Sequence, residues 1–276
     1  MEINRDGLKR YMDEYGVVDT LKGVAELLDK RVYFSVDGFN ICRKELNLAL
    51  PAVAFSKDDE LMLDTIHSCI SPIERQHIDK IDRMSNLTVE KLAEKLEKLL
   101  IKDSLEHTMR YAKELLYKDE NRFYTVLGKF ALLDSIKSRK ALLISAFRKI
   151  GRKDDELIFL LISYMIKARA DYSDIEKIKN GLSDLSYDDM IVDLKNRLNE
   201  SKERVQCKLG LDIVSYLNLI VETVEIDTSN KEEYKIFIQI LLNNLNLLNE
   251  KRDEIIEKSS EIEKEILQTL ISNLKI

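Results

Sequence analysis

The residues with the most distinctive chemistry form a run of cations between positions 137 and 153. This segment contains no acidic side chain, although the chain as a whole has a net charge of −6. On a helix, several of these cations would lie together beside an apolar face, where they could bind phosphates or an acidic partner. The alternative is a solvated helix end whose cations are stabilised by the helix dipole and by the acids at 154–156. The candidate anion-binding residues are Lys137, Arg139, Lys140, Arg148, Lys149, Arg152 and Lys153.

Two aspartate pairs suggest a different chemistry, because neighbouring carboxylates can hold magnesium. Asp58-Asp59 and Asp154-Asp155, in a helical chain, resemble the motifs of isoprenoid diphosphate synthases, which hold magnesium and diphosphate. That resemblance implies an all-α, metal-dependent enzyme. The family motif requires a further carboxylate one helical turn later, and an apolar residue stands there in both segments. We therefore expect both pairs to be first-turn acids that the helix dipole stabilises.

One segment, residues 32–42, departs from the helical pattern and predicts a β-hairpin. Apolar residues alternate before and after Asp37-Gly38, which is a strong signal for a two-residue turn. With this turn, Val36 would face Phe39. An isolated hairpin is marginally stable in water, so we expect its apolar face to pack on helices.

The end of the first strand, Asp37-Gly-Phe-Asn40, resembles the first strand of the PIN-like NYN ribonucleases. The resemblance covers about ten residues, which is a short motif, and it implies that Asp37 helps to hold a catalytic metal. Such a nuclease needs further carboxylates at the ends of other parallel strands. No other strand followed by an aspartate can be recognised, so we prefer the hairpin interpretation.

Histidines and cysteines do not form a recognisable metal site. His67 and His77 could meet across a helical hairpin, but their spacing does not force three ligands to converge. The remaining histidine is His107, and the cysteines are Cys42, Cys69 and Cys207. The sequence also lacks a glycine-rich phosphate loop, a G-x-S-x-G elbow and an H-E-x-x-H helix. We therefore expect neither a metal nor a cofactor.

The scarcity of turn residues predicts the fold class. The 276 residues include 8 Gly and 2 Pro, too few for most sandwiches, barrels and doubly wound folds. We expect an all-α fold, either a multi-helix antiparallel bundle or a degenerate helical-hairpin array, with one small β-hairpin near residues 32–42. Capping and periodicity predict helix starts near residues 4, 18, 56, 72, 87, 104, 120, 136, 153, 174, 187, 208, 230 and 250. Ser56 and Ser186 are among the predicted N-caps, and helices should end at Gly16, Gly151 and Gly181.

Differences in polarity suggest two regions, an N-terminal helical region with the hairpin (1–85) and a C-terminal helical domain (86–276). Segments that are apolar on all sides must be surrounded by other helices. Three such segments should form the core of the second region: Leu157–Ile166, Leu209–Val224 and Ile236–Leu248. The last helix, 254–274, has an apolar stripe that should cover this core; the alternative is a coiled-coil seam in a homodimer.

These observations favour a non-enzymatic helical scaffold or adaptor that binds a protein partner. The alternatives are a nucleic-acid-associated protein that uses a basic helix at 137–153, and an all-α metal-dependent enzyme with aspartate pairs. The N-terminus lacks the apolar segment of a signal peptide, and the longest apolar run is too short to span a membrane. We therefore expect a cytoplasmic protein. Its richness in Lys, Glu, Ile and Leu is also typical of thermophilic proteins.

Overall fold

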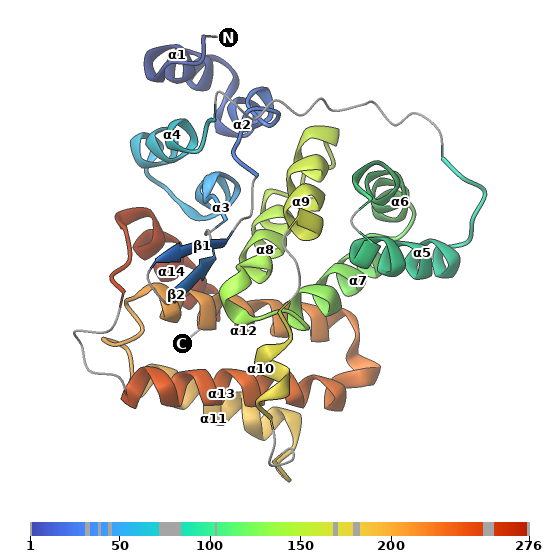
Figure 1. Ribbon diagram of the computed structural model, residues 1–276, viewed down its shortest axis with the longest axis vertical. Coiled ribbons are helices and arrows are strands. Elements are labelled where there is room, and N and C mark those ends of the chain that lie inside the picture. The colour runs from blue at the N-terminus through green and yellow to red at the C-terminus, as the bar shows by residue number, and fades with distance from the viewer. Residues whose placement is uncertain are drawn as a thin grey trace. The chain divides into compact units, whose positions relative to one another are not determined.

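The computed structural model describes residues 2–30, 34–37, 40–43, 46–71, 84–102, 104–167, 171–178, 183–250 and 257–274. Helices form nearly all of the regular structure in these residues, so the prediction of an all-α fold is confirmed (Figure 1). In this part of the chain, no helix combines the length and the apolar character needed to cross a membrane.

The chain forms two compact units, each built from two segments. Unit 1 comprises Met1–Val126 and Ala146–Arg169, and unit 2 comprises Leu127–Ser145 and Ala170–Ile276. The division therefore falls inside helices α7 (Glu120–Leu132) and α8 (Lys140–Ile150). It does not fall between residues 85 and 86, where polarity led us to expect it.

The position of the division follows from the packing of α5 (Val89–Lys102) and α6 (Leu105–Lys118). These two amphipathic helices pack against each other and against α9 (Asp155–Lys167), so they belong with the N-terminal helices. Residues Leu157–Ile166 of α9 are buried throughout, as their all-round apolar character predicted. They form part of the core of unit 1, however, and not of the core that contains the other two apolar segments.

The remaining elements of unit 1 lie in its first sixty-eight residues. They are α1 (Arg5–Tyr15), α2 (Val17–Gly23), β1 (Phe34–Asp37), β2 (Asn40–Arg43), α3 (Ala49–Phe55) and α4 (Asp59–Ser68). Helix α3 was not predicted, because it is short, is buried on nearly all sides and lacks a side-chain cap.

Unit 2 begins with the second half of α7 and the first half of α8, joined through a short 3₁₀ turn. Its other elements follow after residue 170. The 3₁₀ segments are η1 (Ile136–Ser138) and η2 (Thr228–Tyr234), and the helices are α10 (Ser173–Glu176), α11 (Tyr187–Glu200), α12 (Lys208–Ile226), α13 (Lys235–Glu250) and α14 (Glu261–Leu274).

Helix ends show how local sequence sets these boundaries. Ser186 caps α11 by accepting a hydrogen bond from the Asp189 N–H, as predicted. Gly16 and Gly151 follow α1 and α8 with φ of 86° and 68°, values that favour glycine. At α4, Asp58 and not Ser56 is the N-cap, since its carboxylate accepts from the Leu61 N–H.

The predicted continuous helix from residue 136 is interrupted at Arg139. Residues 136–138 form η1, Arg139 has left-handed backbone angles (φ 59°, ψ 12°), and α8 begins at Lys140. Among the described residues, Arg139 is the non-glycine position with a positive φ. Such a conformation costs about 1–2 kcal/mol, so surrounding contacts must hold it.

The strands β1 and β2 pair antiparallel, with Val36 opposite Ile41 and Asp37 opposite Asn40. This register differs from the expected one, in which Val36 faces Phe39. The expected register failed because the position of Gly38 in the sequence is compatible with two different two-residue turns. Gly38 suits the second position of a type I′ turn as Asp-Gly and the first position of a type II′ turn as Gly-Phe. The expected packing of the hairpin's apolar face on helices involves side chains that lie outside the described part of the chain.

The core of unit 2 surrounds α12 and α13. Residues 211–220 of α12 are buried, and α12 packs against α13 and α14. In α14, the predicted stripe is buried at Ile262, Ile266, Leu270 and Leu274; Ile255 lies outside the described residues. Because this chain itself buries these four residues, the described part of the predicted homodimer seam through 254–274 does not present an exposed apolar stripe.

Gly128 marks the closest approach of α7 to α12. A Cβ placed on Gly128 would lie 2.6 Å from Thr223 Oγ1 and 3.1 Å from Thr223 Cγ2. Thr223 is β-branched and buried, and its hydroxyl donates to the Leu219 carbonyl at 2.7 Å. The threonine therefore has little freedom to move away.

Gly128→Ala should reduce the free energy of unfolding by about 1–3 kcal/mol, because overpacking outweighs the better helix propensity of alanine. Thr223→Ala in the same chain should restore most of the loss, since it removes both clashing atoms. Urea denaturation of the four chains of this double-mutant cycle measures the coupling. Additive effects of the two substitutions would contradict the close approach.

Candidate functional site

The seven candidate cations are divided between the two units. Lys137, Arg139 and Lys140 belong to unit 2. The other four, Arg148, Lys149, Arg152 and Lys153, belong to unit 1. The interruption at Arg139 also places Lys137 outside α8, so the helical wheel that grouped Lys137, Lys140 and Arg148 does not apply.

Two of the unit 2 cations point into the protein and not toward solvent. Arg139 is 4% exposed, and its guanidinium pairs with Asp212 (Nε–Oδ1 3.1 Å) and Glu263 (Nη2–Oε1 2.8 Å). Lys140 is fully buried, lies 2.8 Å from Asp134 Oδ2 and is stacked over the Phe130 ring. Neither side chain can contact a nucleic-acid backbone in this fold.

Three further cations, Lys137 in η1 and Arg148 and Lys149 on α8, differ in exposure. Lys137 and Lys149 are exposed, while Arg148 is half-buried, with its guanidinium 5.5 Å from the centre of the Tyr124 ring. Tyr124 and the neighbouring Phe123 are buried. They therefore pack in the core of unit 1 and are not available for base stacking.

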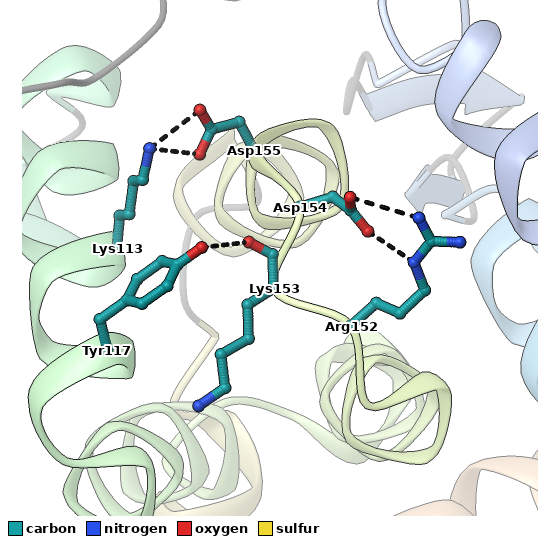
Figure 2. Close-up of a pocket in the computed structure, with 6 residues that line it drawn as sticks. All are labelled: Lys113, Tyr117, Arg152, Lys153, Asp154 and Asp155. Carbon is teal, nitrogen blue, oxygen red and sulfur yellow. Dashed lines mark hydrogen bonds and ion pairs between the residues drawn. The ribbon is translucent and has the colours of Figure 1, made fainter.

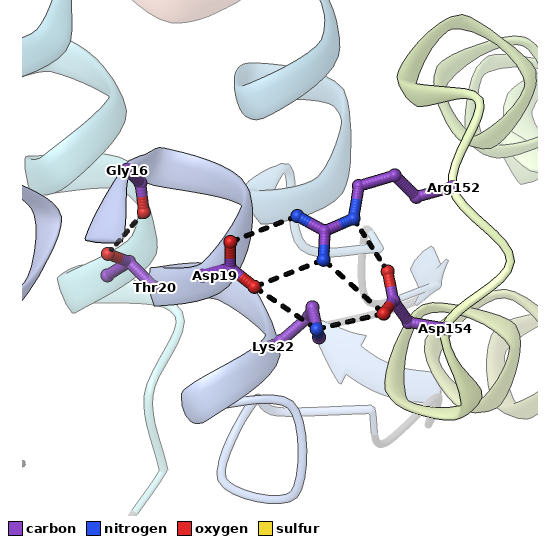
Figure 3. A network of polar contacts seen from close by, with 6 residues as sticks. All are labelled: Gly16, Asp19, Thr20, Lys22, Arg152 and Asp154. Atoms are coloured by element: carbon purple, nitrogen blue, oxygen red, sulfur yellow. Dashed lines mark hydrogen bonds and ion pairs between the residues drawn. The ribbon is translucent and has the colours of Figure 1, made fainter.

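Arg152, in the link between α8 and α9, belongs to a cluster of opposite charges (Figure 3). Arg152 donates to Asp19 on α2 (Nη1–Oδ2 3.0 Å) and to Asp154 (Nε–Oδ2 2.8 Å). Lys22 joins the same two carboxylates, at 3.1 Å from Asp19 and 2.9 Å from Asp154. Two cations and two carboxylates thus fasten α2 to the α8–α9 link.

Beside this network lies a groove of about 410 Å³. It is lined by α6 and the start of α9, with the link between α8 and α9 at its base (Figure 2). The lining residues are Lys113, Tyr117, Arg152, Lys153, Asp154 and Asp155.

Ion pairs hold the charged side chains of the groove in place. Lys113 Nζ lies 2.7 Å from Asp155 Oδ1, and Lys153 Nζ lies 2.7 Å from Glu120 Oε2. Tyr117 donates its hydroxyl to the Lys153 carbonyl (3.1 Å), while the residue as a whole remains 53% exposed. The groove therefore combines an exposed aromatic ring with charges that are already neutralised.

The electrostatics of the groove favour permanently charged groups. Burial opposes ionisation of Asp154, but Lys22 and Arg152 outweigh it and lower the pKa of this carboxyl. Hydrogen bonds to Asp19 and Asp154 raise the pKa of Arg152. General acid–base catalysis needs a pKa close to the working pH. The pKa of Asp154 and the pKa of Arg152 are both shifted away from neutral pH.

The aspartate pairs act at helix starts, as expected. Asp58 caps α4 and Asp59 lies in its first turn, while Asp155 lies in the first turn of α9 and pairs with Lys113. His67 and His107 are exposed, and His77 is outside the described residues. Within the described residues, no group of three His, Cys, Asp or Glu side chains could hold a metal ion.

The strand segment that resembles a nuclease has a different setting from that family's. Asp37 and Asn40 face each other across an antiparallel pair, and in the described part of the chain the sheet has two strands. The parallel strands that would bring further carboxylates to Asp37 are not present in that part.

Comparison with known proteins gave no significant match: no family model, curated protein or solved structure is similar to this chain.

Sequence reasoning singled out four of the six residues that line the groove, but not the two on α6. Lys113 and Tyr117 were not singled out, because α6 looks like an ordinary amphipathic helix. Asp19 and Lys22 were missed because more than a hundred residues separate them from Arg152, and no local pattern signals such a contact. A usable signal was the acidic triplet after Lys153: the predicted pairing is confirmed for Arg152 with Asp154, whereas Lys153 pairs with Glu120.

Asp154→Asn should lower the free energy of unfolding by about 1 kcal/mol near pH 7, because partly exposed ion pairs contribute modestly. The pKa of Asp154 is lower in the folded protein, so its contribution is fully present above its unfolded value of about 3.9 and is lost as the pH falls. Urea denaturation should show a constant difference from wild type between pH 7 and about pH 5, shrinking below about pH 4.

Asp13→Asn, at an exposed position of α1, is the matched control and should leave the unfolding free energy unchanged at every pH. If the difference in unfolding free energy between wild type and Asp154→Asn stayed the same at low pH, the proposed ion-pair role of Asp154 would be contradicted.

Proposed function

We propose that this protein is a non-enzymatic helical scaffold or adaptor, and that it binds a protein partner through the groove beside Tyr117. The observation that carries the proposal is the exposed Tyr117 ring in a rim of fixed ion pairs. Tyrosine and arginine are enriched among the residues that dominate protein–protein binding energy. The Tyr117 ring offers contact area for a partner, and a polar rim that is already ordered lowers the entropic cost of binding.

The chemistry of the groove supports binding more than catalysis. Its carboxylates are occupied by Lys113, Lys22 and Arg152, and the lowered pKa of Asp154 and the raised pKa of Arg152 keep those two groups charged. A partner that presents an apolar side chain to Tyr117 and polar groups to the rim would disturb few of these pairs. As part of the same proposal, we expect a cytoplasmic protein whose helices form an antiparallel bundle.

A photo-crosslinking amino acid at position 117 tests this proposal in the native cell. We expect one discrete crosslinked product from position 117. The matched control is position 15, because Tyr15 lies on the same unit and is 52% exposed, against 53% for Tyr117. Absence of a product from position 117, or the same products from both positions, would overturn the proposed site.

Nucleic-acid binding is the competing function, and the inward position of Arg139 and Lys140 argues against it. A mobility-shift assay at about 50 mM salt should show no binding, although phosphate-driven affinity is strongest at low salt. The control is the pair of substitutions Arg148→Glu and Lys149→Glu, on the least buried end of α8. Binding by the wild type that this pair abolishes would replace the adaptor proposal.

A further inference from the structure

Unit 2 carries an uneven set of charges in its interior. Among its described residues, the buried charged side chains are two cations and three carboxylates: Arg139, Lys140, Asp134, Asp212 and Glu263. Moving ions out of water is costly, and close pairing repays that cost only in part. The third carboxylate therefore needs a particular explanation.

That third carboxylate belongs to α14. Glu263 is in the third position of the helix, and Arg139 contacts it through Nη2 at 2.8 Å. The same arginine already pairs with Asp212 of α12 through Nε. Arg139 thus connects the start of α14 to the start of α12, and its left-handed backbone directs it there.

Glu263 also caps its own helix. Its Oε2 accepts from the Ser260 N–H (2.8 Å) and the Ser260 hydroxyl (2.9 Å), as in a capping box. The two oxygens therefore have separate partners, one local and one on Arg139. If α14 moved away, its first turn would keep its cap.

The charges that remain without α14 would be balanced. Arg139 would still pair with Asp212, and Lys140 with Asp134. This differs from an ordinary buried ion pair, in which removal of one partner leaves an isolated charge in the interior. Departure of Glu263 would therefore leave the Arg139–Asp212 and Lys140–Asp134 pairs intact.

The packing of α14 would also let this helix leave while α12 stays in place. Its buried side chains lie on one face, and the helix packs chiefly against α12. Helix α12 is also packed against α13, η1 and η2, so these contacts would hold it in place. The described segment before α14 adds an isolated bridge between Cys207 and Lys258 and a hydrogen bond from the Lys208 N–H to the Glu257 carbonyl (3.2 Å). At the other end of α14, Lys195 donates to the Leu274 carbonyl (2.9 Å).

We propose that α14 is a strap that detaches from unit 2 as one piece and closes again on Arg139. In the open state it uncovers the apolar face of α12, with the Arg139–Asp212 pair at one end. The vacated groove would accept an amphipathic helix with a carboxylate in its first turn. The segment that fits it is α14 itself.

Native-state hydrogen exchange of the full chain tests the strap. We expect the amides of α14 to exchange through an opening that leaves α12 and α13 protected, since partial openings expose contiguous segments. Glu263→Gln should raise the exchange rates of α14 about tenfold or more, because a charged hydrogen bond in the interior is lost. The rates in α12 and α13 should stay unchanged.

Glu261→Gln is the matched control. Glu261 lies in the same first turn, but its side chain is 78% exposed and pairs with Lys264 at the surface. It should leave the exchange of α14 unchanged. The strap is refuted if wild-type α14 exchanges together with α12 and α13, if Glu263→Gln accelerates all three helices alike, or if it accelerates none. The wild-type measurement decides the first point even if Glu263→Gln does not fold.

Discussion

The ion pairs of Arg139 are the constraint on which the rest of unit 2 depends. A guanidinium that is 4% exposed must be met by carboxylates, and these come from α12 and α14. Arg139 reaches them with left-handed backbone angles, and α8 begins at the next residue, Lys140. The interior charge therefore determines where one helix begins and how two others are placed beside it.

The same principle explains why a basic segment does not become a basic surface. Cations close together in sequence repel one another unless carboxylates from elsewhere separate them. In unit 2 the carboxylates are buried ones, and in unit 1 they are Asp19, Asp154 and Glu120 at the surface. The net charge of a segment therefore says little about its surface potential when at least four of its seven cations form ion pairs in the folded chain.

Local signals predicted local structure well. The Ser186 cap, the glycines after α1 and α8, and the starts of α5, α6, α7, α11 and α12 were all within two residues of their predicted places. The failures came from tertiary contacts. Residue 139 leaves the helical pattern because of Asp212 and Glu263. The helix 157–166 joins unit 1 because any neighbouring helix could cover its apolar surface. The bundle arrangement stays a prediction for the same reason.

The two proposals rest on different physics and on different units. In the groove beside Tyr117, all ion pairs are partly exposed and none needs to break when a partner binds. At α14, one buried ion pair must break and an apolar face is uncovered, and the unequal number of carboxylates lets the ion pair break without an orphaned charge. Surface pairs are screened by salt and buried pairs much less so. Raised ionic strength should therefore weaken the ion pairs at the rim of the groove at a lower salt concentration than it weakens the Arg139 cluster.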